Sequence, residues 1–350
     1  MSLVPWIRRN VVKVLQNVEL DKDGLRRYQL LKLRDIVKYA YERSAFYREL
    51  FRKSGIKPQG VKSFKEFSKI PFTLPIHIAE NPYRFLCVSQ SEILRGFLVE
   101  DIDGGPRRTF FTEDELMHIV ESTAFGLKMA NFKEGDTVLI SVPREAEWGV
   151  HQILEMAVRA GGGNGVLASD LWFEAQIQAL RDVKPQILIG PAYHVFYFSE
   201  WCEEKFPSTL KGLGLKSVIM VRGCIFYPVT ESMKRDLREI WGCEIFEHYG
   251  ITEMGFTVAM ECQRHDGMHI NEADVYAEVV DLKSGEPLEP GEEGELVLTS
   301  INRRGMPIIR YKTGDITKLI DEPCECGDAL TRRLASIRYR LRGGCNYNGG

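Results

Sequence analysis

Short apolar segments alternate with helical segments through the middle of this chain, and this alternation limits its fold more than any other feature. The apolar segments read as buried strands and cover residues 137–142, 186–190, 217–221 and 243–246. Residues 150–160 and 231–241 carry apolar side chains at helical spacing. Strands that alternate with helices of about 10–15 residues form parallel βαβ units. The sequence therefore predicts a layered α/β core.

Other patterns flank this core. Residues 30–40 carry an apolar helical stripe, and Thr112 and Glu115 have the spacing of a capping box that begins a helix. The predicted strands 275–281 and 295–299 are joined by turns rich in glycine and proline, which indicates hairpins. We expect four parts: a helical segment over 1–80, an α/β core over 81–265, a smaller β-rich unit over 266–340 and a tail over 341–350.

Composition narrows the class of protein. The 350 residues are 44% hydrophobic and 27% charged, which is typical of a folded globular chain. The 46 basic and 49 acidic side chains leave a net charge of −3, without the basic excess of a nucleic-acid-binding protein. We find no apolar run of about 18 residues and no signal-peptide core. With eight scattered cysteines, the sequence predicts a cytoplasmic protein with reduced thiols and no membrane partner.

Two short strings carry residue types suited to a nucleotide. They are EHYGITE at residues 247–253 and RYKTGD at residues 310–315. An aromatic ring can stack on a base, and a carboxylate can hold Mg²⁺. A threonine hydroxyl can bond a phosphate, and an aspartate can accept hydrogen bonds from ribose. Either string alone also fits an ordinary turn.

Together, about 60 residues apart, the two strings resemble the adenylate-forming superfamily. The more specific resemblance is to the phenylacetate–coenzyme A ligase family, which includes coenzyme F390 synthetase-like proteins. Further matching segments are residues 41–49, 261–263, 267–270, 285–288, 294–296 and 306–317. The resemblance extends over most of residues 25–340 and is densest over 245–327.

The resemblance implies a two-step reaction with ATP and Mg²⁺. A carboxylate attacks the α-phosphate to give an acyl-adenylate and pyrophosphate, and a thiol, usually coenzyme A, then takes the acyl group. In this sequence Tyr249, followed by Gly250, would stack on adenine, and Thr252 would contact the α-phosphate. Glu253 would bind Mg²⁺, and Asp315 would hold the ribose hydroxyls.

Further candidates rest on fewer matching residues. Gly223 falls where the family has a Gly-Ala-Glu-Pro segment along the adenine. Trp148 and His151 fall in the segment that forms the acyl pocket. Arg310 either reaches the phosphates or forms a surface ion pair. His248 either orients the nucleotide pocket or packs in the core.

The phosphate loop departs from the family pattern. The family has a Ser/Thr/Gly-rich loop that ends in lysine, whereas residues 99–109 here contain three carboxylates and no such hydroxyl cluster. A carboxylate about 4 Å from a phosphate charge costs about 4 kcal/mol at an effective dielectric constant of 20. Arg107 and Arg108 offset part of this repulsion. The alternative is an acidic surface loop that binds no phosphate.

A second departure concerns the C-terminal hinge and lid. The family core ends at a Gly-Arg-x-Asp-Asp hinge, followed by a lid of roughly 100 residues that closes the site. Arg338 and Arg340 match the basic residues before this hinge, but residues 341–350 lack the aspartate pair. We therefore expect adenylation to be weakened or lost, unless another chain supplies the lid.

Cysteine and histidine pairs predict a structural zinc site. Cys262 and His265, with Cys324 and Cys326, have the short paired spacings of tetrahedral zinc ligands. Four protein ligands leave no open position for a substrate, so this zinc would be structural. It would join the β-rich unit to the core. The alternative is four ordinary reduced side chains near turns.

Two functions remain open at this point. The first is a phenylacetate–coenzyme A ligase-like enzyme that activates an aromatic or other small carboxylate, with nucleotidyl transfer of the F390 synthetase type as a variant. The second is a non-catalytic relative that binds AMP, an acyl group or a partner protein. The expected partners are a small carboxylate and a nucleotide, with a homodimer or a separate lid-bearing chain as the protein partner.

Overall fold

One large mixed sheet organises the molecule. The computed structural model describes residues 2–16, 19–99, 105–142, 149–168, 172–222 and 229–341. The strands of the sheet are β3 (Thr137–Ile140), β4 (Asn164–Leu167), β5 (Ile187–Pro191), β6 (Ser217–Arg222), β7 (Glu244–Tyr249), β8 (Ala259–Glu261), β9 (Met268–Ile270), β10 (Val275–Val280), β11 (Glu293–Ser300), β12 (Tyr311–Ile320), β13 (Arg333–Leu334) and β14 (Tyr339–Arg340). Their order is β10-β11-β12-β13-β9-β8-β7-β6-β5-β3-β4, with β14 beside β12.

The strands β4, β3, β5, β6 and β7 are parallel, which confirms the predicted α/β core. The helices of this part are α6 (Glu113–Leu127), α7 (Val150–Ala160), α8 (Phe173–Val183), α9 (Ala192–Lys205) and α10 (Glu231–Trp241). Alternate strand residues face opposite sides of the sheet. Leu139 and Leu188 therefore join the hydrophobic cluster beneath α8, α9 and α10, whereas Val138 and Ile189 join the larger cluster on the other side.

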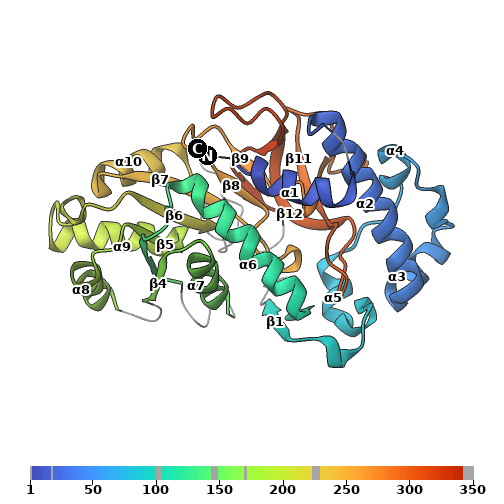
Figure 1. Cartoon of the computed structure of the whole chain (residues 1–350), viewed down its shortest axis with the longest axis horizontal. Coiled ribbons are helices and arrows are strands. Elements are labelled where there is room, and N and C mark those ends of the chain that lie inside the picture. The colour runs from blue at the N-terminus through green and yellow to red at the C-terminus, as the bar shows by residue number, and fades with distance from the viewer. Residues whose placement is uncertain are drawn as a thin grey trace.

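Helices form the N-terminal part of the chain. They are α1 (Val4–Val14), α2 (Lys22–Arg43), α3 (Ala45–Lys53), α4 (Phe64–Phe67) and α5 (Pro75–Glu80). The 3₁₀ turns are η1 (Pro58–Gly60), η2 (Pro82–Phe85), η3 (Gln90–Glu92), η4 (Lys128–Ala130), η5 (Lys211–Leu213) and η6 (Thr252–Met254). Figure 1 shows α2–α5 at the opposite end of the molecule from α8–α10, with α6 crossing the middle.

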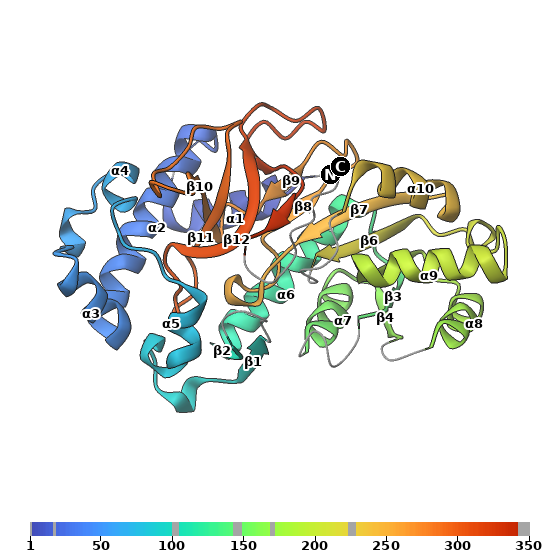
Figure 2. The same ribbon diagram turned by 180° about the vertical axis from the view of Figure 1, so that it is seen from behind.

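The β-rich C-terminal part continues the same sheet. β7 pairs antiparallel with β8, β8 with β9, and β9 with β13, so the change from parallel to antiparallel falls inside one sheet. The boundary expected at residue 265 lies between paired strands β8 and β9; the domain limits themselves stay predictions. Figure 2 shows β10, β11 and β12 beside α1 and α2.

Two details bear on the sequence-based expectations. Thr112 and Glu115 form the predicted capping box at the start of α6. The aromatic run at residues 193–198 lies in α9 and is only partly buried, with Tyr197 50% exposed. None of the described helices combines the length and the apolar character needed to cross a lipid bilayer.

Candidate functional site

A cavity of about 160 Å³ lies at the carboxyl ends of β6 and β7. A two-stranded hairpin of β1 (Arg95–Val99) and β2 (Arg107–Phe111) forms one side, and α7 another. Its apolar lining includes Phe97, Leu98, Val150, Ile153, Leu154, Val221 and Phe256. Its polar lining includes Arg107, Arg222, His248, Thr252, Glu253, Tyr311, Thr313 and Arg340. This edge of a parallel sheet is where α/β proteins bind ligands.

A tight loop after β7 brings Thr252 and Glu253 to this cavity. The chain turns back on itself, so a Cβ atom on Gly250 would lie 1.3 Å from the carbonyl oxygen of Phe256. The Phe256 backbone N–H also donates to the carbonyl of Ile251, at 3.1 Å. Only glycine fits at position 250, and this close approach determines where the next residues lie.

Glu253 lines the cavity and accepts hydrogen bonds from three residues that are far away in the sequence. It is 2% exposed, and its Oε1 accepts from Arg107 Nε at 2.6 Å and from the Tyr311 hydroxyl at 2.7 Å. Arg303 donates to its backbone carbonyl. Burial acts to raise the pKa of the Glu253 carboxyl, but Arg107 and Tyr311 outweigh it and hold this pKa below its usual range. The carboxylate is therefore ionised, with a guanidinium as its counter-ion.

The negative charge of Asp315, in β12, is likewise balanced by an arginine. Arg340 binds it with two hydrogen bonds, from Nε at 2.7 Å and from Nη2 at 2.8 Å. The Tyr249 hydroxyl donates to the same carboxylate at 2.7 Å. The structure thus joins the two sequence strings through their tyrosine and aspartate.

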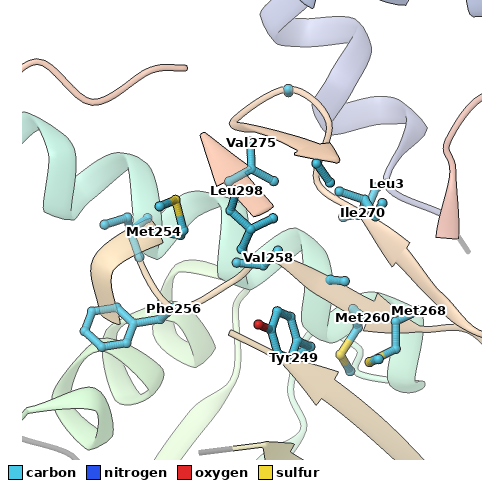
Figure 3. Close-up of a cluster of buried hydrophobic side chains, with 14 of the residues drawn as sticks. Leu3, Tyr249, Met254, Phe256, Val258, Met260, Met268, Ile270, Val275 and Leu298 are labelled. Carbon is cyan, nitrogen blue, oxygen red and sulfur yellow. The ribbon is translucent and has the colours of Figure 1, made fainter. Parts of the chain in front are cut away.

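The Tyr249 ring does not face the cavity. It is 2% exposed, and Figure 3 shows it within the hydrophobic cluster that also contains Val258 and Met260. The described cavity lining includes its neighbours His248 and Gly250 instead. The stacking role expected of Tyr249 is therefore replaced, in this structure, by a packing role and a hydrogen bond to Asp315.

Arg310 fits neither of its two predicted roles. It is 2% exposed and pairs with the buried Glu278, whose Oε2 lies 3.1 Å from its Nε. It also donates to the backbone carbonyls of Ser68 and Ile70. These contacts join the N-terminal segment to β10 and β12, so Arg310 is a structural residue.

The remaining candidates divide into three cases. His151 is buried in α7 and is not among the described residues that line the cavity. The residues of α7 that do line it are Val150, Ile153 and Leu154. Trp148 and Gly223 lie outside the described residues. His248 does line the cavity, and neither of its ring nitrogens has a hydrogen-bond partner among the described residues. Burial lowers the pKa of His248 to about 4, so its imidazole is neutral.

Four side chains gather on the far side of β8 and β9 as a candidate metal site. The ligand atoms of Cys262, His269, Cys324 and Cys326 all lie within 4.8 Å of one another. The Sγ atoms of Cys262 and Cys324 are 3.7 Å apart. Thiolates about 2.3 Å from a tetrahedral zinc lie about 3.7 Å from each other, so the group has zinc-site dimensions.

The histidine of this group differs from the predicted one. His265 lies apart, with its Nε2 2.8 Å from Glu244 Oε2. His269 takes its place, and its Nδ1 lies 2.8 Å from the Thr331 hydroxyl and 3.4 Å from Asp328 Oδ2. A histidine that ligates zinc usually donates its other N–H to a carboxylate or similar acceptor. Sequence spacing favoured His265, and only the pairing of β9 with β13 reveals His269.

Similarity to known proteins points to one superfamily. Residues 149–302 match the AMP-binding enzyme family. The phenylacetate–coenzyme A ligase of Pseudomonas putida is 29% identical over 308 residues, which are 85% of this chain and 67% of that protein. The Escherichia coli K12 enzyme of the same name is 28% identical over 345 residues, 93% of this chain and 75% of that protein. Over most of its length this chain is distantly similar to phenylacetate–coenzyme A ligases, and its central part matches the AMP-binding enzyme family.

Solved structures with a similar fold include those of a coenzyme A ligase. An open conformation of 2-hydroxyisobutyryl-CoA ligase, in complex with 2-HIB-AMP and CoA, gives a TM-score of 0.82 at 21% identity. The match covers 92% of this chain and 76% of that chain. The same ligase in its thioesterification state also gives a TM-score of 0.82, over 90% of this chain and 68% of that one. This chain therefore shares the fold of 2-hydroxyisobutyryl-CoA ligase.

The surroundings of Glu253 in this chain do not suit Mg²⁺. Magnesium prefers octahedral oxygen coordination with several waters, whereas Glu253 Oε1 already accepts from Arg107 and Tyr311. A doubly charged ion about 4 Å from a guanidinium is repelled by about 8 kcal/mol at an effective dielectric constant of 20. The magnesium role that the resemblance implies for Glu253 is therefore at odds with this side-chain arrangement.

Proposed function

We propose that this chain binds a nucleotide and a small carboxylic acid in the cavity and joins them as an acyl-adenylate. A carboxylate oxygen attacks the α-phosphorus of ATP, the bond to pyrophosphate breaks, and the thiol of coenzyme A then displaces AMP to form a thioester. The main support is that Gly250 and Thr252 meet Thr313 at one cavity, although the two strings are far apart in sequence. The homology to phenylacetate–coenzyme A ligases supports the same reaction.

We assign the parts of this reaction to particular side chains in or next to the cavity. In this proposal the Thr252 hydroxyl, which lines the cavity, donates to an α-phosphate oxygen, and the Asp315 carboxylate, bonded to Arg340 beside the cavity, accepts from ribose hydroxyls. The acyl group would occupy the apolar side formed by Phe97, Val150 and Leu154. This apolar lining favours an apolar acyl group, such as an aryl or short alkyl acid.

A second function has its own support. Both carboxylates assigned to ligands are already paired with arginines, Glu253 with Arg107 and Asp315 with Arg340. Such pairs stabilise the site without a ligand and weaken the phosphate chemistry that the family performs. The second candidate is therefore a non-catalytic protein that binds AMP or an acyl group.

Isotope exchange between labelled pyrophosphate and ATP separates the two functions. We expect exchange with at least one member of a panel of aryl and alkyl acids. Thr252→Val should reduce it about 100-fold, because one hydrogen bond to the transition state is lost. Thr137→Val, at the opposite end of β3 from the cavity, is the matched control. Binding of AMP in a thermal-shift titration without exchange for any acid would favour the non-catalytic function, and no AMP shift would contradict both.

We further propose that Cys262, His269, Cys324 and Cys326 hold a structural zinc. The support is their donor set and spacing, together with Asp328 behind His269. All four positions of a tetrahedral ion would come from the protein, so this metal would have no open site for substrate.

A further inference from the structure

The Glu253 carboxylate forms an ion pair with the guanidinium of Arg107, which lies in the β1–β2 hairpin beside the cavity. Arg107 is 5% exposed and belongs to β2, where it pairs with Val99 of β1. Its Nε donates to Glu253 Oε1 at 2.6 Å, across 146 positions of sequence. Both side chains line the cavity. A buried carboxylate needs a compensating charge, and here that charge is part of the protein.

Other contacts hold Glu253 in this arrangement. The Tyr311 hydroxyl donates to the same Oε1 at 2.7 Å, and Arg303 donates to the Glu253 backbone carbonyl. Arg303 in turn donates to the Phe110 carbonyl at 2.7 Å, in the same strand as Arg107. The hairpin and the loop after β7 are thus joined at both the side chain and the backbone of Glu253.

We propose that Arg107 takes the place of a divalent cation beside Glu253, so that this chain binds AMP and an acyl-adenylate without magnesium. A guanidinium carries a permanent positive charge and suits phosphate oxygens, so it can balance the charge of an α-phosphate at the cavity. The inference rests on the proposed nucleotide binding, but concerns a separate property, its dependence on a metal ion.

Calorimetric titration of AMP into the full chain, in excess EDTA and in excess Mg²⁺, tests this inference. For the wild-type protein we expect the dissociation constant to differ by less than about twofold between the two buffers. Arg107→Gln should weaken binding about tenfold or more in EDTA and recover part of it with Mg²⁺, because Glu253 is then open to a metal ion. Lys318→Gln is the control, since Lys318 is an exposed basic residue of β12 outside the cavity lining.

Two further variants keep the test valid if Arg107→Gln does not fold. Arg107→Lys retains the positive charge and should keep binding independent of Mg²⁺. The double variant Arg107→Gln with Glu253→Gln removes both charges of this pair, and should bind AMP weakly with no gain from Mg²⁺. Circular dichroism verifies that each variant is folded.

The outcomes are distinct. Wild-type binding that weakens about tenfold in EDTA would leave the proposed function intact and overturn the inference. Unchanged AMP binding by Arg107→Gln in EDTA would overturn it as well. No AMP binding by the wild-type protein in either buffer would remove the proposed nucleotide site and the inference together.

Discussion

At the scale of single residues, buried and partly buried carboxylates connect distant parts of this chain. Asp274 accepts from Trp6 Nε1 at 3.0 Å and lies 2.6 Å from His118 Nε2, so it links α1, α6 and the segment before β10. Glu278 pairs with Arg310 in the same way. Removing one partner of a fully buried pair, such as Glu278 and Arg310, typically costs about 3–5 kcal/mol, because the other charge is left uncompensated.

The pair of His118 and Asp274 predicts a pH-dependent stability. Burial acts to lower the pKa of His118, but Asp274 and Glu121 raise it above 6.5, against a small opposing effect of Lys13. The contribution of His118 is therefore fully present below pH 6.5 and is lost as the pH rises through its raised pKa. Burial acts to raise the pKa of Asp274, but His118, Asn302 and Trp6 lower it below 3.8, so its contribution is lost only in acid.

We expect His118→Gln to destabilise the protein more at about pH 6 than at about pH 9, because only the charged histidine pairs fully with Asp274. Urea unfolding of both proteins at the two pH values measures this difference. An equal loss of stability at both pH values would contradict the ion pair.

Gly250 makes a second residue-scale prediction. A methyl group at this position would collide with the Phe256 carbonyl at 1.3 Å, and backbone atoms cannot move aside as a flexible side chain can. Gly250→Ala should lower the free energy of unfolding by about 3 kcal/mol and abolish AMP binding.

Gly126→Ala is the control for this substitution. Gly126 lies in α6, where an added Cβ would meet only Thr257 Cγ2 at 3.6 Å. We expect it to be neutral or stabilising by up to about 1 kcal/mol, as alanine is the better helix former. Chemical denaturation of both variants decides the matter, and a well-folded Gly250→Ala protein that binds AMP normally would refute the close approach.

At the scale of elements, the Cys/His group joins the end of β8, strand β9 and the segment between β12 and β13. Cys262 follows β8, His269 is in β9, and Cys324 and Cys326 lie in the turn between β12 and β13. These strands are short, since β8 and β9 have three residues each and β13 has two. A metal ion at their junction would therefore supply stability that the hydrogen-bonded ladder alone does not.

We expect protein purified without added metal to contain about one zinc per chain, and strong chelators to lower its melting temperature by about 3 °C or more. His269→Gln should lose the metal. His265→Gln, a nearby histidine outside the group, should retain it. Elemental analysis by mass spectrometry gives the stoichiometry, and a value near zero for the wild-type protein would end the proposal.

At the scale of the whole molecule, the cavity lies where the two halves of one sheet meet. Parallel strands β6 and β7 contribute their carboxyl ends, and the antiparallel half contributes β12 and β14. The hairpin β1–β2 closes over this junction and carries Arg107 into it. The candidate site therefore depends on the continuity of the sheet rather than on either half alone.

Periodicity was sufficient to predict the parts of this fold that depend on local patterns. The strands β5 and β6 and the helices α6, α7 and α10 lie where apolar spacing and capping residues placed them. The α/β class follows from their alternation. The strand β4 at the edge of the sheet was not predicted. Its sequence Asn164–Leu167 is short and contains a glycine, and both of its end residues are exposed, so it lacks the apolar run of a buried strand.

The sequence by itself determined the class of fold, the two strings around Thr252 and Asp315, and three of the four candidate metal ligands. Only the tertiary structure decided the partners: Arg107 for Glu253, Arg340 for Asp315, Glu278 for Arg310, and His269 in place of His265. The physical reason is that local patterns record burial and backbone preference, whereas the partner of a buried charge is selected by distance in space. Whether Glu253 meets a metal ion or a guanidinium therefore depends on where β2 lies, which no local pattern encodes.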